Sequence, residues 1–183
     1  MMYSPSYVIR HPSYVILHTS SCIRRRIIMI TKNLGYFEIG IYQPKHWENV
    51  GTLWRSAWQL GAAGIFTIGG TKQKHQITDV LRVDKRIPLR CFPDFDAFLS
   101  ARPQGAELIG IEMGGKALNT FVHPIRAVYL LGSEVDGLPR EVLSKCQHVL
   151  EIESINYPSF NVSVSGSLVM YHRLFHTQQR ERY

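Results

Sequence analysis

Asparagine, arginine, glutamate and serine side chains, which donate and accept hydrogen bonds, gather in three short clusters of the sequence. The clusters are NVGTLWR (residues 49–55), LLGSEVDGLP (residues 130–139) and PSFNVSVSGSL (residues 158–168). Each lies where an expected strand gives way to an expected helix. Because ligands of α/β folds gather at the carboxyl ends of strands, this placement favours a binding or catalytic site.

The first two clusters each have a structural and a functional interpretation. Asn49 can cap a helix, Gly51 allows close backbone approach, and Arg55 can project near the same helix end. These residues equally fit a capped amphipathic helix with a surface arginine. In the second cluster, Glu134 beside Asp136 fits an acid/base pair, or two acids favoured at a helix start by the helix dipole.

The third cluster can be interpreted as a strand or as the start of a helix. Ser159 and Asn161 alternate with Phe160 and Val162, which has the period of a half-buried strand. Alternatively, Ser159 or Asn161 caps a helix that continues through SLVMYHRLF. In either case the hydroxyl and amide groups offer several donors and acceptors where the chain enters its last helix.

Several familiar chemistries lack their motifs in this sequence. There is no Walker A motif and no G-x-G-x-x-G, which argues against kinases, NTPases and dinucleotide-binding enzymes. The histidines have no metal-ligand spacing, so we expect no metal site, and no nucleophile–His–Asp arrangement is evident. Cys22, Cys91 and Cys146 lie far apart, which indicates reduced thiols in a cytoplasmic protein.

The elements that must position the clusters alternate along the chain. Strands are expected at residues 36–42, 63–70, 89–92, 107–113, 127–134 and 148–154, and helices at 48–61, 93–101, 138–146 and 160–176. This alternation is typical of βαβ units. We therefore expect an α/β fold, a mostly parallel sheet flanked by helices, over residues 35–183.

Residues 1–34 differ from the rest of the chain. They repeat PSYVI and contain five basic residues (Arg10, Arg24, Arg25, Arg26 and Lys32) and no acid, within a chain of net charge +7. We interpret them as a basic appendage, poorly ordered or an extended start ahead of Met29; a targeting peptide is the alternative. Basic charge slightly favours a polyanionic partner. No apolar run approaches the roughly 20 residues that cross a bilayer, so we expect no membrane association.

Taken in order, the motifs resemble those of a known family. NVGTLWRSA, LLGSEVDGLP and IESINYPSFNVSVSGSLVMY resemble the three motifs of the SpoU (TrmH-type) branch of the SPOUT RNA methyltransferases. The third is similar to that family's S-L-N-V-S-V-A signature, with Phe160 replacing the usual Leu and Ser165 replacing a small Ala. The resemblance covers the chain from about Tyr36 to the C-terminus.

The resemblance implies a fold, a cofactor and a reaction. The fold would end in a C-terminal deep trefoil knot, and the protein would be a homodimer. The reaction would be methyl transfer from S-adenosylmethionine to a ribose 2′-hydroxyl of structured RNA, tRNA more than rRNA. Catalytic residues implied by the motifs are Asn49, Arg55, Glu134, Ser159 and Asn161; cofactor-binding residues are Leu131, Gly132, Ile152 and Phe160.

In such enzymes the arginine is the leading candidate to activate the hydroxyl, helped by an RNA phosphate. Since arginine nearly always stays protonated, orientation of the hydroxyl is less demanding than a literal base role. RNA contact is expected from a basic stretch beside the active face: Lys72, Lys74, His75, Arg82, Lys85, Arg86 and Arg90. Two alternatives stay open: a catalytically silent RNA-binding relative, and a small-molecule enzyme on a flavodoxin-like sheet.

Overall fold

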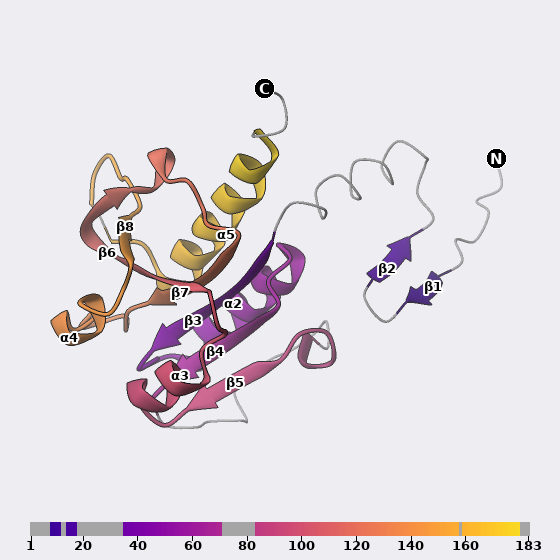
Figure 1. The fold of residues 1–183 in the computed structure, drawn as a ribbon, viewed down its shortest axis with the longest axis horizontal. Helices are drawn as coiled ribbons and strands as arrows, with labels where there is room; N and C mark the ends of the chain where they lie inside the picture. The colour runs from indigo at the N-terminus through magenta and orange to yellow at the C-terminus, as the bar shows by residue number, and fades with distance from the viewer. Residues whose placement is uncertain (1–7, 12–13, 18–34, 71–82, 158, 180–183) are drawn as a thin grey trace. The chain divides into compact units, whose positions relative to one another are not determined.

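The computed structural model describes residues 8–11, 14–17, 35–70, 83–157 and 159–179, which form two separate units. The first contains an antiparallel hairpin of β1 (Val8–His11) and β2 (Tyr14–Leu17), built from the two copies of the repeated segment. The rest of residues 1–34, where we predicted the basic appendage, lies outside the described residues. The second unit carries a six-stranded sheet (Figure 1).

Every pairing in this sheet is parallel, which confirms the expected α/β fold class. Its strands, listed in chain order, are β3 (Tyr36–Tyr42), β4 (Gly64–Ile68), β5 (Leu89–Phe92), β6 (Glu107–Ala117), β7 (Arg126–Leu131) and β8 (His148–Glu151). Across the sheet they lie in the order β5-β4-β3-β7-β6-β8. A flavodoxin-like sheet has a different order, so that alternative is wrong.

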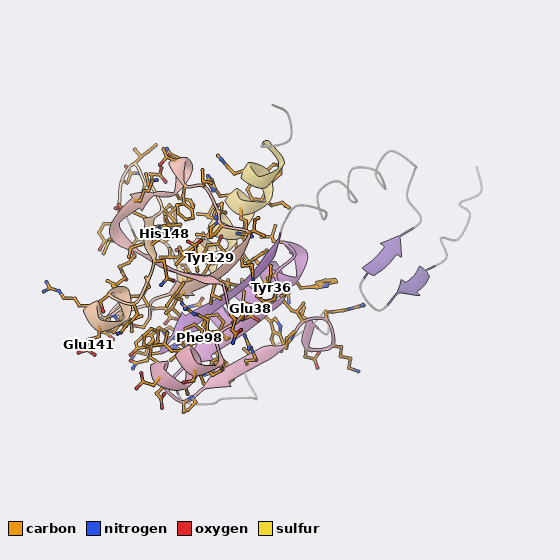
Figure 2. The ribbon with its side chains drawn as sticks, viewed as in Figure 1. Tyr36, Glu38, Phe98, Tyr129, Glu141 and His148 are labelled. Atoms are coloured by element: carbon orange, nitrogen blue, oxygen red, sulfur yellow. The ribbon has the colours of Figure 1, made fainter. Side chains whose placement is uncertain are left out.

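Helices cover both faces of the sheet. On one face, Phe98 of α3 (Phe95–Ala101) stacks on Phe66 of β4, with ring centroids 4.8 Å apart, in a core that extends to Val142 of α4 (Arg140–Leu143). On the other face, α2 (Trp47–Gln59) and α5 (Val162–Gln179) pack against each other and the sheet. Figure 2 labels Phe98, which belongs to the first core, and Tyr129 of β7.

A buried arginine attaches α5 to the sheet. The guanidinium of Arg173 donates to the carbonyl oxygens of Pro124 and Ile125 and to the Tyr129 hydroxyl, at 2.8, 3.1 and 3.0 Å. It also lies over the Phe37 ring, 4.9 Å from the centroid. A buried charge is tolerated only with such partners. These contacts fix the helix that begins at the third polar cluster.

The strands and helices agree with the sequence expectations, apart from their ends. Expected strands 127–134 and 148–154 stop at Leu131 and Glu151, because residues 132–139 and 152–157 leave the sheet. Expected strand 107–113 is longer, with β6 running to Ala117 through an irregular register against β8. Within the described residues, no helix is long and apolar enough to cross a membrane.

Candidate active site

The three polar clusters meet at one edge of the sheet. β3 and β7 are parallel neighbours, with Ile41 opposite Leu131, so the segments that follow them leave the sheet side by side. After β3 the chain passes through residues 43–46 and enters α2. After β7 it continues into the loop of residues 132–139. This is the edge at which parallel α/β sheets bind ligands.

Glu134 joins these two segments through its carboxylate. It accepts hydrogen bonds from the backbone N–H of Lys45 and His46, at 3.0 and 3.3 Å, and from Nδ2 of Asn49 at 2.7 Å. Partial burial works to raise the pKa of Glu134, but the hydrogen bonds from Asn49, Lys45 and His46 outweigh it and hold the pKa below its usual value. Glu134 is therefore an ionised acceptor at neutral pH, and the neighbouring N–H groups position it.

Asn49 also contacts the third cluster. Its Oδ1 accepts a hydrogen bond of 3.0 Å from Nδ2 of Asn161. The Oδ1 of Asn161 in turn accepts from the backbone N–H of Ser163 (2.9 Å) and Val164 (3.4 Å) and from the Ser163 hydroxyl (2.7 Å). These are the contacts of a helix N-cap. Asn161 thus caps α5 and at the same time links all three clusters.

A cavity of about 380 Å³ lies beside this network. It is lined by all four residues predicted to bind the cofactor, Leu131, Gly132, Ile152 and Phe160, and also by Glu134, Ser159 and Asn161. Its size falls within the range of about 300–1,000 Å³ that is usual for small-molecule sites. Seven of the nine predicted catalytic and cofactor residues therefore surround one cavity.

Two glycines allow the loop after β7 to fold tightly over this cavity. Ser133 and Gly137 exchange backbone hydrogen bonds of 3.2 and 3.1 Å, and Gly137 has a φ of +66°. A Cβ on Gly132 would lie 2.3 Å from the carbonyl carbon of Gly137 and 2.6 Å from the nitrogen of Leu138. These neighbours are backbone atoms that cannot swing aside, so a side chain at residue 132 is incompatible with the loop.

Glu112 anchors the same loop, and the sequence analysis missed it. Its Oε2 accepts a hydrogen bond of 2.7 Å from the N–H of Leu138, and a Cβ on Gly137 would lie 2.5 Å from that oxygen. Glu112 also lines the cavity. It lies in the irregular part of β6, which the adjacent Gly114–Gly115 pair could have indicated as a strand interruption.

We predict that Glu112→Ala lowers the free energy of unfolding by about 1–3 kcal/mol, because it leaves the Leu138 N–H without its acceptor. Glu112→Gln keeps an oxygen acceptor and is expected to cost less. Chemical denaturation of both variants measures this, with Glu141→Ala as control, since Glu141 is exposed on α4. Equal losses for the Ala and Gln variants would contradict the anchoring role.

Two predicted residues do not line the cavity. Asn49 acts through Glu134 and Asn161, as described above. Arg55 lies half-buried on α2, and its Nε is buried without a hydrogen-bond partner among the described residues. Both residues therefore lie outside the lining of the cavity.

The structure describes only part of the basic stretch predicted to bind RNA. Lys72, Lys74, His75 and Arg82 lie outside the described residues. Lys85 and Arg86 are exposed, with the Arg86 guanidinium over the Trp58 ring. Arg90 instead forms an ion pair with the buried Glu38. Lys85 and Arg86 thus remain available on the surface, whereas the Arg90 guanidinium is engaged.

The residues that the sequence analysis missed fall into recognisable groups. Ser133, Val135 and Gly137 line the cavity from the loop after β7, within the second cluster itself, together with Asp136, which the sequence analysis had named beside Glu134. Ile111, Glu112 and Met113 come from the irregular part of β6, and Glu151 from the end of β8. In the described residues, no group of three or more His, Cys, Asp or Glu side chains could hold a metal ion.

Comparison with known proteins places this arrangement in context. The model of the SpoU rRNA Methylase family matches residues 36–171. No curated protein matches the chain.

Solved structures share the fold. A structure described as giving insights into the 2-OH methylation of C/U34 on tRNA is 26% identical, with a TM-score of 0.70, over 82% of this chain and 96% of that one. The AdoMet-bound rRNA methyltransferase from Sinorhizobium meliloti is 21% identical, with a TM-score of 0.69, over 78% of this chain and 57% of that one. The SpoU methyltransferase AviRb from Streptomyces viridochromogenes is 17% identical, with a TM-score of 0.72, over 91% of this chain and 67% of that one.

Proposed function

The chain belongs to the SpoU rRNA Methylase family, a family of RNA methyltransferases, and from this premise we propose that it methylates a ribose 2′-hydroxyl of structured RNA. The observation that carries the proposal is the chain of hydrogen bonds Glu134–Asn49–Asn161, which joins all three motifs beside one cavity. An RNA-binding protein without activity would not need these groups to converge.

The cavity fits S-adenosylmethionine as the methyl donor. Leu131, Ile152 and Phe160 offer apolar surface, and Gly132 brings backbone to the wall where a side chain could not fit. Carboxylates of Glu112, Glu134 and Glu151 also line the cavity, and acidic groups suit a ligand that carries a sulfonium and an ammonium group. The AdoMet-bound state of the Sinorhizobium meliloti structure, which shares the fold, agrees with this assignment.

Held by Leu131, Gly132, Ile152 and Phe160, S-adenosylmethionine would supply an electrophilic methyl group and would leave as S-adenosylhomocysteine. The protein must orient the hydroxyl and let its proton leave. Arg55, held by the RNA phosphate, is the group we assign to orient and activate the hydroxyl. Glu134, Asn49, Ser159 and Asn161 hold the surrounding backbone and the substrate in position.

Transfer RNA is the favoured substrate. The similar structure concerned with tRNA is matched over 96% of its length, and its stated chemistry is methylation of the 2-OH of C/U34. The Sinorhizobium meliloti rRNA methyltransferase is matched over only 57% of its length. We also propose a cytoplasmic location, where tRNA is found. The trefoil knot expected from the resemblance stays a prediction.

The test is transfer of labelled methyl groups from S-adenosylmethionine into total tRNA and rRNA, followed by analysis of the nucleosides. We expect label in 2′-O-methylated nucleosides from tRNA. Label in a base would contradict ribose methylation, and label in rRNA alone would contradict the tRNA preference. Cofactor binding without label in either RNA would favour the catalytically silent relative.

We also propose that two copies pair through α5. Four apolar side chains on this helix are exposed at spacings of four, three and four residues: Val164, Leu168, Tyr171 and Phe175. Such spacing places them on one face of a helix. Val169 and Met170 of the same helix are buried against the domain. Helix α5 therefore has one packed face and one exposed apolar face. An unpartnered stripe of this kind favours a second copy over solvent.

Tyr171→Glu is expected to convert the dimer into a monomer at micromolar concentration, because it places a charge in the middle of the stripe. Sedimentation velocity measures the change. Ser100→Glu adds the same charge on the exposed surface of α3 and serves as control. A wild-type chain that is monomeric at this concentration would contradict the proposal.

A further inference from the structure

A second cavity, of about 260 Å³, lies at the same edge of the sheet. It is formed by the carboxyl ends of β4 and β5 and the first residue of α2. Its lining residues are Trp47, Thr67, Gly69, Gly70, Cys91, Phe92 and Pro93, and none of them lines the first cavity. It is therefore a separate site, which no part of the proposed function uses.

Residues 43–46 lie between two lining glycines of this cavity and the polar network. On one side, a Cβ added to Gly69 or Gly70 would lie 3.2 Å from side-chain atoms of Gln43 or Pro44, respectively. On the other side, the N–H groups of Lys45 and His46 donate to Glu134. A four-residue segment thus separates the second cavity from the residues assigned to the ribose.

The first turn of α2 spans the same boundary. Trp47 lines the second cavity, and Asn49 holds Glu134 and Asn161. Two helical residues correspond to a rise of about 3 Å and a rotation of about 200°, so the two side chains point to opposite sides of the helix start. One ligand group in the second cavity and another beside Asn49 would therefore be separated by little more than the helix backbone.

The lining suits one flat heteroaromatic ring. Trp47 contributes an aromatic side chain, Pro93 an apolar ring, and Gly69 and Gly70 bare backbone. The Phe92 ring packs on Phe66 and Phe98, so Trp47 is the aromatic surface on which a ring would stack. Bases stack on aromatic side chains in single-stranded nucleic-acid sites. The volume is below the range of about 300–1,000 Å³ for whole small-molecule ligands, which indicates a fragment of a larger molecule.

We propose that this cavity binds the base of the nucleotide whose ribose is methylated, with the base turned out of its stack. The inference rests on the proposed function, since the ribose of the same nucleotide would then lie across residues 43–46, beside Asn49 and Glu134. Enzymes that do chemistry on a base extrude its nucleotide from the stack, and the same movement would bring this base into the cavity. The cavity would therefore determine which base is accepted.

Cys91 provides a direct probe, because it is exposed and lines the cavity. The rate of its alkylation by iodoacetamide is measured in the full chain by peptide mass spectrometry. Each of the four ribonucleoside 5′-monophosphates is added in turn, with ribose 5-phosphate as the control that lacks a base. We expect at least one monophosphate to slow alkylation fivefold or more and ribose 5-phosphate to leave it unchanged. Equal rates in all arms would overturn the proposal.

A variant gives a second, independent measurement. Cys91→Trp fills the cavity and should raise KM for the substrate RNA tenfold or more. Its affinity for S-adenosylmethionine should stay within twofold of wild type. Ser100→Trp introduces the same side chain on the exposed surface of α3 and should change neither quantity. A wild-type KM for Cys91→Trp would overturn the proposal even if the alkylation result agreed with it.

These results separate the cavity from the reaction. Protection of Cys91 by a monophosphate in a protein that methylates no RNA would support the base site and reject the proposed function. Methyl transfer to RNA by a protein whose Cys91 is never protected would support the proposed function and reject the base site.

Discussion

Replacing Arg55 with alanine is expected to lower methyl transfer to RNA by about 10²–10³-fold, the size of effect typical for loss of one preorganised donor in an active site. Affinity for S-adenosylmethionine should stay within twofold of wild type, because Arg55 does not line the cavity assigned to the cofactor. The thermal midpoint should also change little, since the Arg55 Nε has no hydrogen-bond partner to lose among the described residues.

Two further variants make this result specific. Arg55→Lys keeps the charge but loses the planar fork that binds a phosphate at two points, so it should recover only part of the activity. Arg140→Ala removes an exposed arginine of α4 that lines neither cavity, and it should behave as wild type. Full activity of Arg55→Ala would contradict the role of Arg55 in the reaction. Another group would then have to activate the ribose hydroxyl.

Replacing Gly132 with alanine is expected to abolish cofactor binding and to destabilise the domain. The added Cβ would lie 2.3 Å from one backbone atom and 2.5 and 2.6 Å from two others in Gly137 and Leu138. Since the atoms it meets belong to the backbone, the loop over the cavity must open. We expect a loss of unfolding free energy at the upper end of the range of about 1–3 kcal/mol for overpacked sites, and at least a 100-fold weaker cofactor affinity by calorimetry.

Gly114→Ala is the matched control. Gly114 is exposed and has nothing within 4 Å of its Cβ position, although its φ of +78° makes the substitution mildly strained. It should lose some stability but keep cofactor binding. If Gly132→Ala bound S-adenosylmethionine as wild type does, the tight crossing of residues 132 and 137 would not be a requirement of the site.

Much of this architecture could be predicted from local patterns. The YFEIGIY segment forms β3 with the bounds expected from its apolar run. The positions of α2, α3 and α5 follow from periodicity, and Asp94 caps α3 through the N–H of Ala97. The expected cap at Asn49 was wrong, because α2 begins at Trp47 after His46 and has no side-chain cap. The second and third motifs also named most of the cavity, since Glu134, Ser159 and Asn161 line it together with Leu131, Gly132, Ile152 and Phe160.

Glu112 could not be predicted in the same way. Its role depends on the meeting of β6 with the loop after β7, 26 residues further along the chain. Nothing near Glu112 in the sequence specifies the N–H of Leu138 as its donor. The second cavity is similar, because Trp47, Thr67 and Cys91 belong to α2, β4 and β5 and only become neighbours in the folded domain.

The sequence by itself determined which segments become strands and helices, because side-chain periodicity and capping act between residues a few positions apart. Only the tertiary structure decided that β7 lies between β3 and β6, and that Asn49 meets Asn161 across a separation of 112 residues. Strand order depends on which apolar faces pack and on the path of the connecting segments, and these are properties of the whole chain. For that reason the motifs identified the chemical groups, whereas the fold determined how they meet.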